Sequence, residues 1–173
     1  MSSGKKALGP VVSAAHLADG AMPSLSEMEF AMTILNNAFQ RWMVRCMGAA
    51  GVSGLGPLDV QILHSTNHRG REKTLSDLCM MLNIEDTHVV SYALKKLEGA
   101  GLLETGRRGK EKTVKVTKEG AEACARYREV REALLVGSVE GLRFEDEEIS
   151  RIAALMRTLS GQYDQASRSA ASM

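Results

Sequence analysis

The chain has 173 residues, enough for one domain with additional helices, and its hydrophobic fraction of 44% can supply a hydrophobic core. The 22 Lys and Arg residues nearly cancel the 21 Asp and Glu residues, so only the distribution of charge along the chain is informative. No apolar run reaches the roughly 20 residues of a membrane span, and the first residues lack the pattern of a signal peptide. We therefore expect a cytoplasmic protein with no membrane partner.

The first predicted element is a long helix that follows a tail rich in Gly, Ala and Ser. Ser26 and Glu29 form an S-x-x-E capping box, and Leu25 and Phe30 are placed to form a hydrophobic staple across it. Apolar residues then recur every four positions as far as Cys46, in two adjacent rows. This apolar face is wider than one neighbouring helix would cover.

Three more helices are predicted before residue 100. The first starts at Pro57, which suits the first position of a helix, and ends near Asn67. Thr74 is a good N-cap for a short second helix, and Asp86 caps a third that ends at Gly99. The last two, joined by a tight turn, have the size of a helix-turn-helix unit, which places its second helix in the major groove of DNA.

The second helix of this pair is predicted to have two different faces. Its apolar positions follow helical spacing and comprise Val89, Val90, Ala93, Leu94 and Leu97. Its other face offers hydrogen-bonding and cationic groups suited to base edges and phosphates, namely Thr87, His88, Ser91, Tyr92, Lys95 and Lys96. An ordinary amphipathic helix with a solvated polar side also fits these residues, so the helix pair alone does not establish DNA binding.

The segment after this helix is predicted to be a basic β-hairpin. The stretches "LLET" and "TVKV" are short strands, and the loop between them contains Gly106 and Gly109, which would let the backbone approach a groove wall. A Walker-type phosphate loop needs Lys-Ser/Thr after its last glycine and then a helix; two arginines and a strand stand here, which excludes nucleotide binding. An arginine-tipped hairpin behind a recognition helix is how a winged helix contacts phosphates or the minor groove. The candidate wing residues are Arg107, Arg108, Lys110 and Lys112.

Two further helices complete the predicted order. Thr117 caps a long helix whose inward-facing residues are predicted to be Ala121, Cys124, Tyr127, Val130 and Leu134. An acidic first turn then opens the last helix, because anionic side chains favour a helix N-terminus. This helix is predicted to end at Gly161, and its apolar face comprises Ile149, Ile152, Ala153, Met156 and Leu159.

Other candidate sites have weaker support. His64 and His68 are four residues apart and could chelate a metal, but no further ligand is evident, so they are interpreted as ordinary surface histidines. Cys46, Cys79 and Cys124 fall on predicted apolar faces and are interpreted as reduced core thiols; Cys46 best fits a redox role because Arg45 is adjacent. No nucleophile–base pattern is evident. We expect no enzyme, no cofactor and no metal site.

The order of elements and two stretches resemble the MarR family of bacterial transcription regulators. "TLSDLCMMLNIEDTHVVSYALKKLEGAGLLE" matches the helix-turn-helix and first wing strand, and "TVKVTKEG" matches the second wing strand with the T-x-x-G start of the next helix. The wing is about three residues shorter than is usual in the family and lacks its Asp, which leaves open which arginine enters the minor groove. The resemblance implies a mostly α fold with a small hairpin wing. It also implies a homodimer joined through the first and last helices, whose recognition helices lie one DNA turn, roughly 34 Å, apart.

The expected function is therefore sequence-specific binding of double-stranded DNA by a homodimeric regulator that responds to a small-molecule effector. The alternatives are a winged-helix module for protein interaction or DNA architecture, and a cysteine-based redox sensor. The expected segments are a flexible tail (1–23), an N-terminal dimerisation helix and loop (24–54), the winged helix-turn-helix lobe (55–118), C-terminal dimerisation helices (119–163) and a second flexible tail (164–173).

Overall fold

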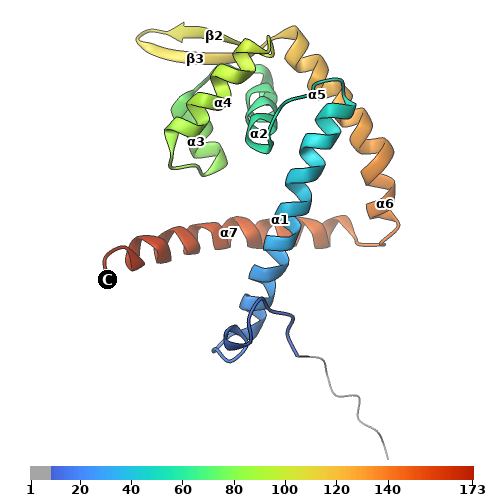
Figure 1. Ribbon diagram of the computed structural model, residues 1–173, viewed down its shortest axis with the longest axis vertical. Coiled ribbons are helices and arrows are strands. Elements are labelled where there is room, and N and C mark those ends of the chain that lie inside the picture. The colour runs from blue at the N-terminus through green and yellow to red at the C-terminus, as the bar shows by residue number, and fades with distance from the viewer. Residues whose placement is uncertain (1–8) are drawn as a thin grey trace, which may run out of the picture. The chain divides into compact units, whose positions relative to one another are not determined.

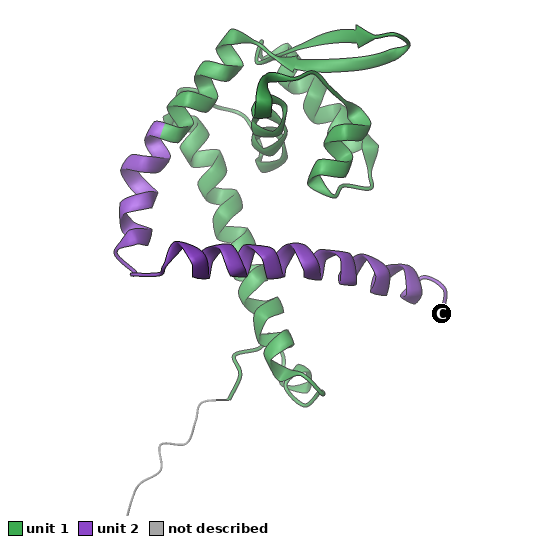
Figure 2. Ribbon diagram, turned by 180° about the vertical axis from the view of Figure 1, so that it is seen from behind, with its two compact units in different colours: residues 1–128 green, residues 129–173 purple. Residues whose placement is uncertain are grey.

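The computed structural model describes residues 9–173, so residues 1–8 of the predicted tail lie outside the described part (Figure 1). The fold is mostly helical with a small three-stranded antiparallel sheet, as predicted. The chain divides into two compact units, residues 1–128 and 129–173 (Figure 2). The helices are α1 (Pro23–Ala49), α2 (Pro57–Asn67), α3 (Leu75–Leu82), α4 (Thr87–Gly99), α5 (Lys118–Arg131), α6 (Gly137–Glu140) and α7 (Asp146–Ala170), with short helical turns at Ala15–Leu17, His68–Gly70 and Glu132–Val136, and the strands are β1 (Lys73–Thr74), β2 (Leu103–Arg108) and β3 (Glu111–Val116).

Helix α1 begins earlier than predicted. Its N-cap is Met22, no side chain caps it, and Pro23 occupies the first turn. The predicted capping box at Ser26 and Glu29 is therefore wrong, because proline, with its fixed φ, already starts the helix three residues before Ser26. Only the last part of α1 is deeply buried, through Met43, Cys46 and Met47.

The core of the first unit lies around α2. Its members are mostly aliphatic, as the low aromatic content requires, and include Val60, Ile62 and Leu63 of α2, Leu78 of α3, Val90 and Leu97 of α4, Leu102 and Leu103 at the start of the hairpin, and Ala123 of α5. Helix α2 contacts α1, α3, α4 and β3, so the α3–α4 pair and the hairpin are held by one common element.

The junction between the hairpin and α5 explains the T-x-x-G motif. The hydroxyl of Thr117 donates a hydrogen bond to the carbonyl of Gly101 at 2.8 Å and accepts one from the N–H of Gly120 at 3.0 Å. A Cβ on Gly120 would lie 2.2 Å from the carbonyl oxygen of Leu102, a distance that no atom pair tolerates. Glycine is therefore needed here because the backbone of α5 passes directly against the hairpin.

The sheet has the strand order β1-β3-β2, and every pair is antiparallel. The predicted hairpin is confirmed, but β1 was missed, since it is two residues long and pairs with Thr113 and Val114, far away in sequence. Strands β2 and β3 also extend further than predicted, so the connection is a two-residue turn of Gly109 and Lys110. Gly109 has φ +64°, as a tight hairpin turn requires at its first position.

The second unit consists of exposed helices. Helix α7 runs through Gly161 to Ala170, so the predicted helix end is wrong and the segment predicted as a tail is largely helical. The N–H of Glu145 donates to the carboxylate of Glu148 at 3.0 Å, which completes the acidic start of this helix. Leu134, predicted to face inward, is 62% exposed. Within residues 9–173, no helix is long and apolar enough to cross a membrane.

Candidate nucleic-acid interface

Polar residues cap both ends of α3 and the start of α4. Thr74 and Asp77 form a capping box at the start of α3, with hydrogen bonds of 3.1 and 2.8 Å in the two directions. Asn83 ends α3 in the left-handed conformation, with φ +53°. Asp86 then caps α4 by accepting a hydrogen bond from the N–H of His88 at 2.9 Å. The predicted helix-turn-helix is thus present, with a short and well-capped turn.

The two faces of α4 agree with the prediction at most positions. Val90, Ala93 and Leu97 are buried in the core, while Ser91 is half-buried. Val89 departs from the prediction, because it is 42% exposed rather than part of the core. The side chains on the exposed face are Thr87, His88, Tyr92 and Lys95, and Tyr92 is 72% exposed.

Lys96 differs from the other predicted contacts because it has a partner within the protein. Its Nζ lies 2.6 Å from Oδ2 of Asp59, which is only 6% exposed. The same carboxylate oxygen accepts the N–H of Gly56 at 2.7 Å and so caps α2. This ion pair joins α4 to the start of α2 and already balances the charge of Lys96.

The hairpin has two faces of different composition, because side chains alternate along a strand. Thr105 and Val114 are paired across the strands and lie on the side of α4, where Thr105 donates a hydrogen bond to Glu98. The next pair outward on this face is Arg107 and Lys112. Lys112, Thr105 and Val114 line a cleft of about 150 Å³ together with residues of α4, including Ser91, Lys95 and Glu98.

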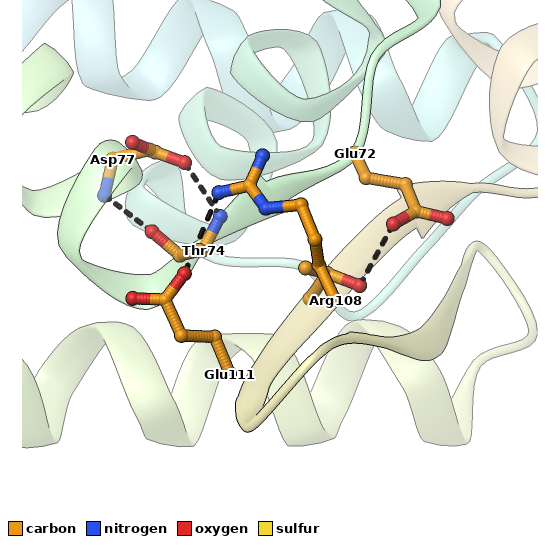
Figure 3. A network of polar contacts seen from close by, with 6 residues as sticks. Glu72, Thr74, Asp77, Arg108 and Glu111 are labelled. Carbon is orange, nitrogen blue, oxygen red and sulfur yellow. Dashed lines mark hydrogen bonds and ion pairs between the residues drawn. The ribbon is translucent and has the colours of Figure 1, made fainter.

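The other face of the hairpin lies toward the start of α3. Thr113 is fully buried and donates a hydrogen bond to Glu72 at 3.0 Å. Arg108 lies 3.5 Å from its cross-strand neighbour Glu111, and in Figure 3 its guanidinium lies beside Asp77. The hydrogen bond that the N–H of Thr74 donates to the Asp77 carboxylate lowers the pKa of that group, and the Thr74 hydroxyl and the positive charge of Arg108 lower it further.

Gly106 has a packing role that the sequence did not reveal. A Cβ at this position would lie 2.9 Å from the hydroxyl of Thr113 and 3.6 Å from the carboxylate of Glu72. The predicted role of this glycine, close approach to a groove wall, is therefore not needed to explain it. Arg107, Arg108 and Lys112 also lie in strands rather than in a loop, which fixes the face on which each of them lies.

Lys73 was not among the predicted site residues, yet it holds the end of α2. Its buried Nζ donates hydrogen bonds to the carbonyls of Thr66, His68 and Arg71 at 3.0, 2.8 and 3.1 Å. Burial, followed by the nearby charge of Arg71, lowers the pKa of Lys73. The polar stretch "HRGREK" did not predict that Lys73 is buried, because the three carbonyls that it bonds come together only in the folded chain.

The predicted role of His64 as a surface residue is wrong. Its ring packs edge-on against Tyr127 with centroids 4.5 Å apart, and burial lowers the pKa of the imidazole. His68, by contrast, is exposed at the end of α2. No group of three or more His, Cys, Asp or Glu side chains in the described part of the chain could hold a metal ion.

The three cysteines are free and buried, as the core interpretation predicted. The thiol of Cys46, the candidate for a redox role, donates a hydrogen bond to the carbonyl of Tyr127 at 3.5 Å. Burial raises the pKa of the Cys124 thiol to about 11, which disfavours the reactive thiolate. Both observations favour a structural role for these residues.

Comparison with known proteins identifies the same region. The family model of the winged helix DNA-binding domain matches residues 55–120. No curated protein matches the chain in sequence. Among solved structures, the chain is similar to a MarR family regulator from Neisseria meningitidis, with 18% identity and a TM-score of 0.63, covering 83% of this chain and 95% of that one. It is also similar to a mutant MarR from E. coli complexed with operator DNA (15% identity, TM-score 0.64, coverage 81% and 98%). BldR from Sulfolobus solfataricus has 19% identity and a TM-score of 0.60, with coverage of 82% and 98%.

These comparisons confirm the predicted resemblance at the level of the fold. Residues 55–120 match the winged helix DNA-binding domain, and about four fifths of the chain has the fold of the MarR family regulators that it resembles.

Proposed function

We propose that this chain is a MarR-type transcriptional regulator that binds duplex DNA in a sequence-specific manner. Helix α4 would enter the major groove, and the β2–β3 hairpin would be the wing. The observation that carries the proposal is the exposed polar face of α4, with Thr87, His88, Tyr92 and Lys95, mounted beside a basic hairpin (Figure 1). The described fold therefore offers one surface for bases and another for the phosphate backbone.

Thr87, His88, Ser91 and Tyr92 are proposed to contact base edges. They lie in the first half of α4, which is the part of a recognition helix that reaches the bases. Val89 joins them in this proposal because its exposed methyl groups suit the C5-methyl of thymine. Replacing thymine by uracil in a bound site removes only this methyl group and would weaken binding at any position that Val89 reads.

A homodimer is the proposed assembly. Several large apolar side chains are exposed on α1, among them Ile34, Leu35 and Phe39. Helix α7, described by itself, exposes a second apolar set that includes Ile149, Ile152 and Leu155. Apolar surface of this kind marks an interaction site. We propose a second copy of the chain as the partner, because a two-fold dimer presents two copies of α4 to the DNA. Light scattering of the purified protein would contradict this proposal if the protein were monomeric at every concentration.

Control by a small molecule is the third part of the proposal. A shallow, open groove of about 390 Å³ lies between α1 and the start of α2, and Arg41 and Arg45 are among its lining residues. Two guanidinium groups suit a small carboxylate. A panel of small carboxylic acids should therefore include one that raises the Tm of the wild-type protein and not that of Arg45→Ala; a panel without any effect on Tm would contradict this site.

The central test is selection of bound duplexes from a random-sequence pool by the purified protein. We expect enrichment of a pseudo-palindromic site, because a two-fold dimer presents two identical recognition helices. Thr87→Ala and His88→Ala should change the enriched sequence rather than only lower recovery. A pool that remains unenriched while the protein still binds DNA would favour the alternative of an architectural module. No binding of DNA at low salt would favour a protein-interaction module.

A further inference from the structure

We infer that the two faces of the wing have different tasks: Arg107 and Lys112 contact DNA, whereas Arg108 is a positioning residue that holds the hairpin against α3. The inference rests on the proposed function and deepens it, since it says which of the two wing arginines contacts DNA. It follows from the register of the hairpin together with the acids on each face.

The register places consecutive arginines on opposite faces. Arg107 pairs with Lys112 and Arg108 pairs with Glu111 across the strands. Thr105, two residues before Arg107, bonds to Glu98 of α4, so Arg107 and Lys112 lie on the α4 side. Arg108 lies on the side of Gly106 and Thr113, which pack against Glu72.

The cations on the α3 side already have acidic neighbours. Arg108 is 3.5 Å from Glu111, and Lys115 is 4.0 Å from Glu104. Arg108 and Asp77 line the same cavity of about 480 Å³ between the hairpin and the start of α3. Glu111 therefore balances part of the charge of Arg108, and the guanidinium also lies beside Asp77 of the helix that precedes the recognition helix (Figure 3).

The cations on the α4 side have no such partners. Across residues 9–173, neither Arg107 nor Lys112 forms an ion pair, and the two face each other across the strands. Like charges placed directly opposite are unfavourable in a sheet, which indicates that a ligand rather than the fold accounts for them. Lys95 of α4 lines the same cleft as Lys112, so positive charge extends from the recognition helix onto this face of the wing. The acid that lines this cleft, Glu98, accepts the hydrogen bond of Thr105. Three cations placed in this way suit the phosphate backbone of DNA.

The test compares three variants that each remove one positive charge from the hairpin. Arg107→Ala changes the α4 side, while Arg108→Ala and the matched control Lys115→Ala change the α3 side. The dissociation constant of a random-sequence duplex pool is measured for each over a range of salt concentrations, because the salt slope counts the phosphates contacted. We expect Arg107→Ala to reduce the slope by about 0.9, one phosphate contact, and the other two to leave the slope unchanged.

The outcomes separate this inference from the proposed function. A wild-type protein that binds no duplex at low salt would overturn both. A wild-type protein that binds, with equal reductions in slope for Arg107→Ala and Arg108→Ala, would overturn the inference alone. Lys112→Gln provides a second variant on the α4 side should Arg107→Ala fail to fold, and its slope should fall by the same amount. Arg108→Ala should in addition lower the Tm, since a positioning residue acts through the fold.

Discussion

At the base of the wing, polar groups are buried or half-buried and bonded to partners, whereas the tip exposes more positive charge than its acidic residue, Glu111, balances. Thr117, Thr113 and Lys73 are bonded to specific carbonyl or carboxylate oxygens, and Gly120 fits only because it has no side chain. Arg107, Lys110 and Lys112 are exposed on the distal half of the hairpin. The difference indicates that the base sets where the wing lies relative to α4, while the tip supplies the charged groups that are proposed to contact DNA. Substitutions at the base should therefore affect stability, and substitutions of Arg107, Lys110 or Lys112 at the tip should affect binding.

The largest effect on this contrast is expected from Gly120→Ala. The added Cβ would meet the carbonyl oxygen of Leu102 at 2.2 Å, and two backbone segments would have to move apart. Overpacking of this kind costs about 1–3 kcal/mol or more, measurable by urea denaturation. Gly99→Ala is the control, because no atom lies within 4 Å of its Cβ position. Equal stability of the two variants would show that the base is not tightly packed.

A second test uses the neighbouring lysines of α4. Lys96→Ala removes the partner of the buried Asp59, while Lys95→Ala removes an exposed charge. Since Lys96 is 37% exposed, solvent screening reduces the expected loss for Lys96→Ala to about 1–2 kcal/mol of unfolding free energy. Lys95→Ala should leave stability unchanged and reduce the salt slope of DNA binding. A reduced salt slope for Lys96→Ala would instead support the sequence-based prediction that Lys96 contacts a phosphate.

Lys112→Glu should separate stability from binding at the tip. The substitution places an acid opposite Arg107 and replaces a like-charge pair with an opposite-charge pair. We expect a gain of about 0.2–1 kcal/mol in stability together with weaker DNA binding. Thermal unfolding and DNA titration of the same preparation measure both. Weaker binding without any gain in stability would show that the like charges of Arg107 and Lys112 do not destabilise the hairpin, which would contradict the reason given for a ligand at this pair.

The smallest effect is expected from pH, through His64. Burial lowers the pKa of its imidazole below the unperturbed 6.5. At a pH between the two pKa values, His64 is therefore protonated in the unfolded chain and neutral in the folded chain. The stability that neutral His64 contributes is complete above about pH 6.5 and is lost as the pH falls toward the lowered pKa. Tm measured from about pH 7.5 to about pH 5.5 should fall less steeply in His64→Gln than in wild type. His68→Gln, at an exposed position, should follow the wild type.

Local signals allowed most of the fold to be predicted. Thr74, Asp86 and Thr117 cap the helices that they were predicted to cap, because a capping side chain bonds to N–H groups only two or three residues away. The same logic failed at Ser26, where Pro23 gives an earlier start signal. It also gave no sign that α7 continues beyond Gly161, since a helix tolerates an isolated glycine.

The parts of the site that escaped prediction depend on distant contacts. Asp59 and Lys96 are 37 positions apart, and Thr113 and Glu72 are 41 apart, so neither pair has a sequence signature. The faces on which Arg107 and Arg108 lie depend on the register, and both residues were predicted to lie in the loop, so no register was available for them. The residue types on this surface were thus predictable, whereas the proposed division between residues that contact DNA and residues that support the wing required the fold.

The reactivity of the Lys73 amine can be used to follow local opening of the winged helix lobe. Its amine is shielded by burial and by three carbonyl acceptors, whereas Lys110 is exposed at the turn of the wing. An amine-reactive reagent should therefore modify Lys110 at once and Lys73 only when the end of α2 opens. The ratio of the two labelling rates, followed by mass spectrometry, would measure how often the lobe opens locally while the rest of the chain stays folded.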